Sequence, residues 1–192
     1  MAAQIRRIAV YCGSNTGRGA AYMDAARALG AEMAARGMEL VYGGTHKGLM
    51  GAVADGCLAA GGRAHGVITE RLAAKGHTHE GLSEVEVLPS MSARKARMIA
   101  LADAFIALPG GIGTLEEFME VWTLNQLGEL GRPAGLFDAE GYFQPFMGFI
   151  DHMIAEGFLP PAHRGAIVVA GEAGALLDGL AAHEPVVVPK WM

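Results

Sequence analysis

Cysteine is scarce in this chain of 192 residues: only Cys12 and Cys57 occur, so a disulfide framework is excluded. Two isolated cysteines are typical of small buried apolar residues in a reducing compartment. No apolar run approaches the roughly 20 residues that a membrane-spanning helix needs. The apolar stretch 8–12 that follows Arg6 and Arg7 is too short for the core of a signal peptide. We therefore expect a cytoplasmic protein with no membrane partner.

A basic excess is also missing, since 15 Lys and Arg stand against 20 Asp and Glu, for a formal net charge of −5. Nucleic-acid-binding domains gain much of their affinity by neutralising phosphates with basic side chains. A nucleic-acid partner is therefore not expected. A small phosphorylated ligand remains compatible with this charge, because one or two local cations are enough to hold it.

What the chain does contain is a regular alternation of short apolar runs and alanine-rich stretches. Hydrophobic residues make up 52% and charged residues 18%, as in globular proteins. Runs such as 104–108 are apolar throughout, which favours a parallel sheet covered on both faces. Strands are expected at 5–11, 38–42, 63–68, 85–88, 104–108, 133–137 and 167–169. Helices are expected at 20–36, 49–60, 91–102, 115–127, 142–156 and near the C-terminus.

This alternation predicts one doubly wound, Rossmann-like α/β domain over residues 1–192, with a mostly parallel sheet and helices on both faces. Ligands of such sheets bind at the carboxyl ends of the strands. Glycine-rich junctions follow three of the expected strands and should outline one crevice. They contain Gly13 and Gly17, then Gly43, Gly44 and Gly48, then Gly110, Gly111 and Gly113.

The turn 109–114, Pro-Gly-Gly-Ile-Gly-Thr, joins an expected strand to an expected helix. Glycines let the backbone approach an anion closely, and a helix N-terminus offers unpaired N–H groups with a partial positive charge. A plain tight turn would also use two glycines. The full pattern in this position is more specific, and we interpret it as a phosphate site.

Charged side chains flank this turn on both sides. Glu116, Glu117 and Glu120 follow it, and Arg94 and Lys95 begin the preceding helix. Acidic residues in a first helical turn usually stabilise the helix dipole, and a cation cluster is usually solvated surface. Carboxylates beside an anion site would nevertheless repel the ligand, which suggests that at least one of them performs chemistry. Arg94, and to a lesser degree Lys95, is expected to reach the site.

Several other kinds of site are disfavoured. The glycines lack the G-x-G-x-x-G order of dinucleotide binding. Gly43 and Gly48 are spaced like the ends of a Walker A loop, but Leu49 and Met50 replace its Lys-Ser/Thr. The segment 77–79, His-Thr-His, is weak evidence for a metal site, and we interpret it as a surface loop. No metal is therefore expected. His46 is either a ligand contact or simply exposed.

With these motifs in hand, the sequence resembles the LONELY GUY family, the cytokinin riboside 5′-monophosphate phosphoribohydrolases, often labelled lysine decarboxylases. The strongest likeness is in the segment 109–117 and in Met91, Arg94 and Lys95. Further likeness lies in the segments 11–14, 42–51, 126–128 and 141–142, so the resemblance covers about residues 5–160.

The resemblance implies a homodimer without a cofactor that hydrolyses an N6-substituted adenosine 5′-monophosphate to free base and ribose 5-phosphate. It maps the catalytic pair to Arg94 and Glu117. Glu117 would stabilise the positive charge on the ribose or activate the attacking water, and Arg94 would orient Glu117 or bind the substrate. Implied substrate-binding residues are Ser14, Gly43, Gly44, Met91, Lys95, Gly110, Gly111, Ile112, Gly113, Thr114, Leu115, Glu116 and Thr123.

The chain departs from the family pattern at three positions. Thr45 replaces a usual third glycine, Ile112 a common aromatic residue and Leu124 a common tryptophan. These departures leave the preferred base open. Alternative hypotheses are a broader nucleosidase acting on AMP or other nucleoside 5′-monophosphates, and a non-catalytic nucleotide or cofactor carrier. A lysine decarboxylase is a poor fit, because no motif marks Lys95 as a pyridoxal phosphate lysine.

Overall fold

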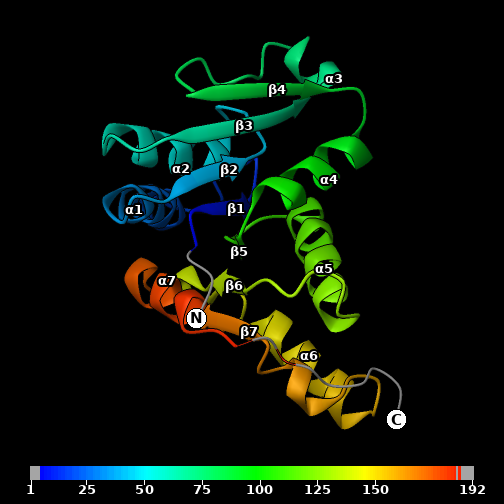
Figure 1. The fold of residues 1–192 in the computed structure, drawn as a ribbon. Coiled ribbons are helices and arrows are strands. Elements are labelled where there is room, and N and C mark those ends of the chain that lie inside the picture. Colours follow the sequence, from blue (N-terminus) through cyan, green and yellow to red (C-terminus); the bar gives the residue numbers. More distant parts are fainter. Residues whose placement is uncertain (1–4, 185, 187–192) are drawn as a thin grey trace.

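Seven parallel strands form the centre of the computed structural model, which describes residues 5–184 and 186 (Figure 1). The order across the sheet is β4-β3-β2-β1-β5-β6-β7, and every neighbouring pair is parallel. The strands are β1 (Arg7–Tyr11), β2 (Glu39–Tyr42), β3 (Ala64–Thr69), β4 (Glu84–Leu88), β5 (Ala104–Ala107), β6 (Ala134–Phe137) and β7 (Ile167–Ala170). The prediction of a single Rossmann-like α/β domain is confirmed, while its expected limits at residues 1 and 192 lie outside the described residues.

Helices cover both faces of this sheet (Figure 1). They are α1 (Ala21–Ala35), α2 (Gly48–Ala59), α3 (Glu70–Ala73), α4 (Met91–Leu101), α5 (Ile112–Gln126), α6 (Gln144–Ala155) and α7 (Ala173–Ala181), with 3-10 turns η1 (Ala139–Gly141) and η2 (Pro161–His163). None of the described helices is long and apolar enough to cross a bilayer.

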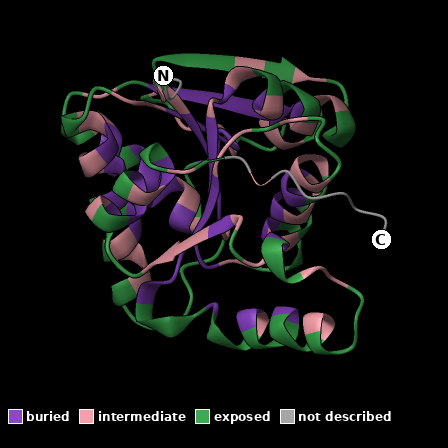
Figure 2. Ribbon diagram, turned by 60° about the horizontal axis from the view of Figure 1, so that its bottom comes forward, coloured by how far each residue is buried: buried purple, intermediate pink, exposed green. Residues whose placement is uncertain are grey.

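Two apolar cores lie on opposite faces of the sheet, and this explains why a central strand such as β5 is apolar throughout. Ile8 and Val10 of β1 pack with α1, α2 and α7, whereas the alternate residues Ala9 and Tyr11 pack with α4, α5 and α6. Successive strand side chains point to opposite faces, so a doubly covered strand needs an apolar residue at every position. Figure 2 shows the buried strands enclosed between helices whose outer faces are exposed.

The direction in which successive strands are added to the sheet reverses between β1 and β5. The chain leaves β1 for α1 on one face and leaves β5 for α5 on the other face. The two connections therefore diverge at the carboxyl ends of these neighbouring strands, which is where a crevice forms in doubly wound folds.

Two expected helices begin at least two residues away from their predicted starts. Helix α5 begins at Ile112 rather than at residue 115, because Gly111 is its N-cap and Gly113 adopts helical backbone despite its low helix propensity. The expected helix 142–156 is shorter, since η1 precedes it and α6 begins only at Gln144. In both places the tertiary contacts override the local preference of the residues.

Helices α1 and α2 pack unusually closely, and glycines permit this approach. A Cβ on Gly30 of α1 would lie 2.7 Å from the backbone nitrogen of Cys57 in α2. A Cβ on Gly56 of α2 would lie 2.8 Å from the Cα of Arg27 in α1. Backbone atoms cannot move aside as a flexible side chain can, so the two helices would have to separate.

We expect Gly30→Ala to destabilise the protein by about 1–3 kcal/mol, the usual cost of overpacking a core. The matched control is Gly148→Ala in α6, where a Cβ meets no atom within 4 Å. That change should stabilise the protein by about 1 kcal/mol through helix propensity alone. Urea unfolding of both variants measures the difference, and equal stabilities would contradict the close packing of α1 and α2.

Candidate functional site

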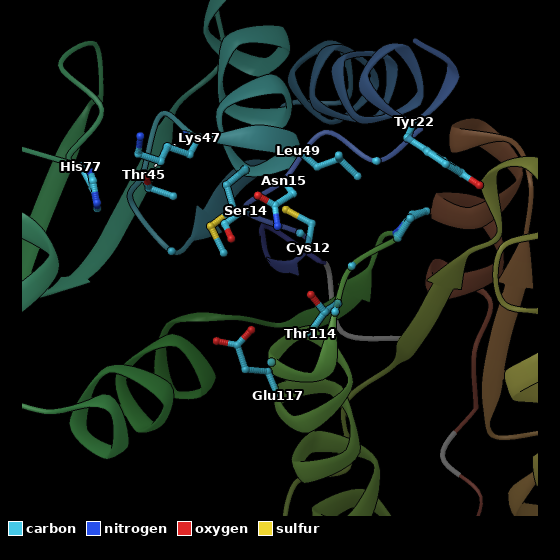
Figure 3. A pocket seen from close by; sticks show the side chains of 18 of the residues that line it. Cys12, Ser14, Asn15, Tyr22, Thr45, Lys47, Leu49, His77, Thr114 and Glu117 are labelled. Atoms are coloured by element: carbon cyan, nitrogen blue, oxygen red, sulfur yellow. Dashed lines mark hydrogen bonds between the residues drawn. The ribbon is translucent and has the colours of Figure 1, made fainter. Parts of the chain in front are cut away.

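A cavity of about 570 Å³ opens at the carboxyl ends of β1, β2 and β5 (Figure 3). Its lining includes many of the residues singled out from the sequence: Ser14, Gly43, Met91, Arg94, Gly110, Gly111, Gly113, Thr114 and Glu117. Glu117 and Thr114 reach the cavity from α5, and Ser14 comes from the loop after β1 (Figure 3). The crevice thus lies where the strand order predicts it.

The three glycine-rich junctions are joined by backbone contacts. The Gly13 N–H donates to the Pro109 carbonyl at 3.0 Å, and the Leu49 N–H donates to the Gly13 carbonyl at 3.0 Å. Gly48 has a φ of +55°, and a Cβ there would lie 2.6 Å from the Asn15 nitrogen. The expectation of one shared crevice is confirmed, since the loops after β1, β2 and β5 form a single wall.

The turn after β5 places glycine where no side chain fits. A Cβ on Gly110 would collide with the Thr114 hydroxyl and lie 2.8 Å from the Gly13 nitrogen. Gly111 is the N-cap of α5, and its carbonyl accepts the Thr114 N–H at 3.1 Å. The turn therefore presents the first N–H groups of a 15-residue helix to the cavity, which is an arrangement suited to an anion.

A buried ion pair forms the floor of the cavity. Arg94 Nη1 donates to Glu117 Oε1 at 2.9 Å, and the two side chains are only 3% and 8% exposed. Arg94 Nε also donates to the Val67 carbonyl at 2.9 Å. Gly43 makes room for the guanidinium, because a Cβ there would collide with it. These contacts orient Arg94 toward Glu117. Of the two roles considered from the sequence, orienting Glu117 or binding the substrate, the geometry supports the first.

Helix α4 sets the position of Arg94. Ser90 is the N-cap of this helix, and its hydroxyl accepts the Ala93 N–H at 3.1 Å. The cap fixes the first turn, in which Arg94 is the buried cation. A guanidinium is suited to this position because its planar fork binds the Glu117 carboxylate and the Val67 carbonyl at once.

The environment of Glu117 changes the proton affinity of its carboxyl. Burial raises the pKa of its carboxyl above the ordinary value, while the charge and hydrogen bond of Arg94 oppose that rise. Water solvates a buried carboxylate poorly, and the adjacent guanidinium compensates in part. Catalytic acids and bases commonly combine burial with one specific charge partner in this way.

The other charged residues near the turn form ion pairs outside the cavity lining. Lys95 pairs with Glu116 and, at 3.1 Å, with Glu120. We expected three carboxylates to lie beside the anion site and to repel its ligand. This expectation was wrong, because only one of the three lies there. Glu117 lines the cavity, whereas Glu116 and Glu120 face Lys95 on the neighbouring helix.

Some residues implied by the resemblance lie away from the cavity lining. Ile112 is 88% exposed and Thr123 is also exposed, while Leu115 packs beside the core under α5. Gly44 has a φ of +74° and packs against Ile68. A substrate role for these residues, and for Lys95 and Glu116, stays a prediction.

Sequence reasoning missed part of the lining. The segment 77–79 was interpreted as a surface loop, yet His77 lines the cavity opposite Thr114 (Figure 3). Backbone hydrogen bonds explain its position: the His46 N–H donates to the His77 carbonyl at 3.2 Å, and the His79 N–H donates to the Gly44 carbonyl at 2.9 Å. Partial burial and the nearby cation of Lys47 lower the pKa of His77.

Other cavity residues that were not predicted as site residues come from four separate segments of the chain. They are Asn15, Tyr22, Lys47, Met50, Leu72 and Tyr142. Nothing in their spacing connects them, because the fold alone brings these segments together. The available signals were the glycines of the loops after β1 and β2 and the family-like segments 42–51 and 141–142.

One group of potential metal ligands lies at the edge of the sheet, within β3 and β4. Ligand atoms of His65, Glu84 and Glu86 fall within 4.8 Å of one another. Arg97 donates to both oxygens of Glu86, at 2.7 and 2.8 Å, and His65 Nε2 lies 3.0 Å from the same carboxylate. The carboxylate is therefore already neutralised by a cation, and we interpret the group as an ion-pair network.

Comparisons with known proteins agree with this geometry. Residues 50–180 match the family model described as "Possible lysine decarboxylase". The chain is 45% identical over 95% of its length, and 81% of the relative's, to the probable cytokinin riboside 5′-monophosphate phosphoribohydrolase LOGL9 of Oryza sativa subsp. japonica. It is 46% identical, over 95% and 75%, to the cytokinin riboside 5′-monophosphate phosphoribohydrolase LOG of the same species.

Solved structures share the fold at much lower identity. The Moco carrier protein from Chlamydomonas reinhardtii superposes with a TM-score of 0.70 at 20% identity, covering 92% of this chain and 95% of that one. At this identity the likeness concerns the architecture alone.

The buried ion pair makes a prediction about stability and pH. Arg94→Met leaves Glu117 buried without its cation, and we expect a loss of about 3–5 kcal/mol where Glu117 is ionised. A raised carboxyl pKa means that ionisation is less favourable in the folded state than in the unfolded state. The loss should therefore be fully present at pH 8 and should shrink as the pH falls through the raised pKa.

Urea unfolding at pH 5 and pH 8 measures this effect. The control is Arg97→Met, which removes a 43%-exposed partner of Glu86 and should cost about 0–1 kcal/mol. A loss in Arg94→Met that does not change with pH would contradict the buried pairing.

Proposed function

The chain belongs to the LONELY GUY family of cytokinin riboside 5′-monophosphate phosphoribohydrolases, and from that premise we propose that it hydrolyses the N-glycosidic bond of N6-substituted adenosine 5′-monophosphates. The observation that carries the proposal is the buried Glu117, held by Arg94 in the same cavity as the glycine-rich turn 109–114. A phosphate anchor and an oriented carboxylate in one crevice are what this reaction requires.

The 5′-phosphate binds at the N-terminus of α5, against Gly110, Gly111 and Gly113. This contact is remote from the bond that breaks, so its binding energy positions the ribose beside Glu117. The C1′–N bond then breaks, and positive charge develops on the ribose ring as in other glycoside cleavages. The carboxylate of Glu117 is placed to stabilise that charge.

Water completes the reaction. Its oxygen bonds to C1′ and one of its protons is accepted by Glu117. The base leaves with the bonding electrons and takes up that proton, which restores the Glu117 carboxylate. The products are the free base and ribose 5-phosphate. Burial raises the pKa of Glu117 above its ordinary value, which makes the carboxylate a better proton acceptor than an exposed one. The equation balances with water alone, so the proposed reaction uses no cofactor.

The cavity also suits an apolar substituent on the base. Met50, Leu72 and Met91 line it together with the polar groups already described. A hydrophobic N6 substituent would gain about 25 cal/mol for each Å² of apolar surface that it buries there. This supports the cytokinin nucleotide over AMP, whose amino group is unsubstituted.

The alternative functions receive less support. Relatives near 45% identity are named as hydrolases, whereas likeness to carrier proteins at 20% identity concerns the fold. Lysine decarboxylation would need a reactive lysine, and Lys95 is instead ion-paired to Glu116 and Glu120.

The decisive experiment measures release of free base from isopentenyladenosine 5′-monophosphate, AMP and the matching nucleosides. We expect the N6-substituted nucleotide to be hydrolysed best and both nucleosides to be inert, because they lack the phosphate anchor. Equal or better turnover of AMP would refute the cytokinin substrate.

The variant Glu117→Gln tests the proposed role of this carboxylate in the same assay. Base release should fall by about 10²–10⁴-fold while nucleotide binding is retained, since the change removes the acid–base group and keeps its size. Glu129→Gln, in an exposed loop after α5, is the control and should keep full activity. Undiminished base release by Glu117→Gln would reject the proposed mechanism.

We also propose that the protein is a cytoplasmic homodimer, as the family resemblance suggests. Both cysteines are buried and free, as expected for a reducing compartment. Met91 and Ile112, beside the cavity, are large apolar side chains that are 52% and 88% exposed. Exposed apolar residues mark an association surface when they form a contiguous patch, and the experiment below tests whether these two do.

Size-exclusion chromatography with light scattering tests the dimer. The chain mass is 20.0 kDa, and we expect twice that mass at micromolar concentration. An Ile112→Glu and Met91→Glu double variant should shift the equilibrium toward monomer if these side chains lie in the interface. A wild-type monomer at these concentrations would rule out the proposed assembly.

A further inference from the structure

Tyr142 reaches across the sheet to the turn that follows β5. Its hydroxyl donates to the Gly110 carbonyl at 2.5 Å, although the two residues are 32 positions apart. Tyr142 lies in the loop between β6 and α6, and its side chain lines the same cavity as Gly110 and Gly111. The hydrogen bond therefore joins a separate connection of the fold to the proposed phosphate site.

The position of Tyr142 is well fixed. Its ring packs edge-on against Tyr22, with centroids 5.8 Å apart, and against Phe143, with centroids 5.1 Å apart. Phe143 is buried, and its N–H donates to Asp138 Oδ1 at 2.6 Å. The Asp138 N–H in turn donates to the Ala170 carbonyl at 2.8 Å, at the end of β7. The hydroxyl is thus held by the sheet through the loop after β6.

The peptide unit that Tyr142 contacts is intrinsically easy to rotate. In a trans peptide the C=O and the following N–H point in opposite directions, so fixing the Gly110 carbonyl also fixes the Gly111 N–H. Glycine on both sides of the unit permits many backbone angles. A rotation of this unit would exchange a carbonyl for an N–H on the side facing a ligand, and the carbonyl would repel a phosphate.

The neighbouring backbone groups of the turn are already fixed. The Pro109 carbonyl accepts from Gly13, and the Gly111 carbonyl accepts from Thr114 and Leu115. Within residues 5–184, the Gly111 N–H donates to no protein acceptor. The Gly110–Gly111 unit is therefore held by the Tyr142 hydroxyl, and the donor on its other end is free for a ligand.

We propose that Tyr142 is a positioning residue that holds the Gly110–Gly111 peptide with its N–H available to the substrate phosphate. The inference deepens the proposed function and rests on its assignment of the phosphate to this turn. A tyrosine hydroxyl has one proton, and here that proton is donated to the Gly110 carbonyl. Tyr142 thus acts through the backbone and does not itself donate to the phosphate.

Tyr142→Phe tests the inference, because it removes the hydroxyl and keeps the ring. We expect KM for the nucleoside 5′-monophosphate to rise about 3- to 10-fold, the usual worth of one hydrogen bond, with kcat changed less. The dissociation constants of ribose 5-phosphate and inorganic phosphate should rise by the same factor. Binding of the free base should not change.

Tyr42→Phe is the matched control. Its hydroxyl is buried, has no hydrogen-bond partner within the described residues and is absent from the cavity lining. The same chemical change there should leave KM and phosphate binding as in the wild type. Thermal unfolding of both variants shows whether the fold is retained.

A backbone readout separates positioning from general loosening of the structure. In wild type and Tyr42→Phe, inorganic phosphate should shift the amide resonance of Gly111, and in Tyr142→Phe this shift should be reduced. Unchanged phosphate binding in Tyr142→Phe would overturn the inference. An equal loss of affinity for phosphate and for the free base would also overturn it. So would a wild-type protein that binds neither inorganic phosphate nor ribose 5-phosphate.

The binding measurements do not depend on turnover, so they distinguish a failure of the proposed function from a failure of the positioning role of Tyr142. If the wild type binds ribose 5-phosphate but hydrolyses no nucleotide, the proposed function fails. The positioning role of Tyr142 is then still decided by the phosphate affinities.

Discussion

The buried ion pair of Arg94 and Glu117 is the interaction on which the rest of the site depends. A carboxylate that is 8% exposed needs a partner, and the guanidinium supplies one at 2.9 Å. That guanidinium must itself be held, which the Val67 carbonyl does. It must also have space, which explains why the residue after β2 is a glycine, Gly43. One ion pair therefore constrains β2, β3, α4 and α5 together.

The same logic applies to the glycine-rich turn beside it. Gly110 has no room for a Cβ because the Thr114 hydroxyl and the Gly13 backbone occupy that space. The close contact brings the loop after β1 against the loop after β5, where the connections diverge to opposite faces. The cavity thus has one wall of backbone N–H groups and a floor with an oriented carboxylate. The glycine-rich turn and the carboxylate are separated in space but are fixed by connected contacts.

Charge placement separates the carboxylate that lines the cavity from the carboxylates that form ion pairs outside it. Glu116, Glu117 and Glu120 are close in sequence and chemically alike, yet Lys95 pairs with the first and third outside the cavity lining. The helical period sets this division, because Glu117 points into the cavity beside Arg94, while Glu116 and Glu120 lie one turn apart and meet Lys95. Burial then raises the pKa of Glu117, which gives it a property suited to proton transfer.

The sequence by itself determined the fold class, the position of the crevice and the choice of Arg94 and Glu117 as the charged residues of the candidate site, whereas their direct contact was decided by the structure. Apolar runs require a doubly covered sheet, glycines mark the close approaches, and the family motifs identify the charged pair. Only the tertiary structure decided that Lys95 points away, that His77 joins the cavity and that Tyr142 holds the Gly110 carbonyl. These contacts join residues tens of positions apart through packing and backbone hydrogen bonds, and no local pattern of residues encodes them.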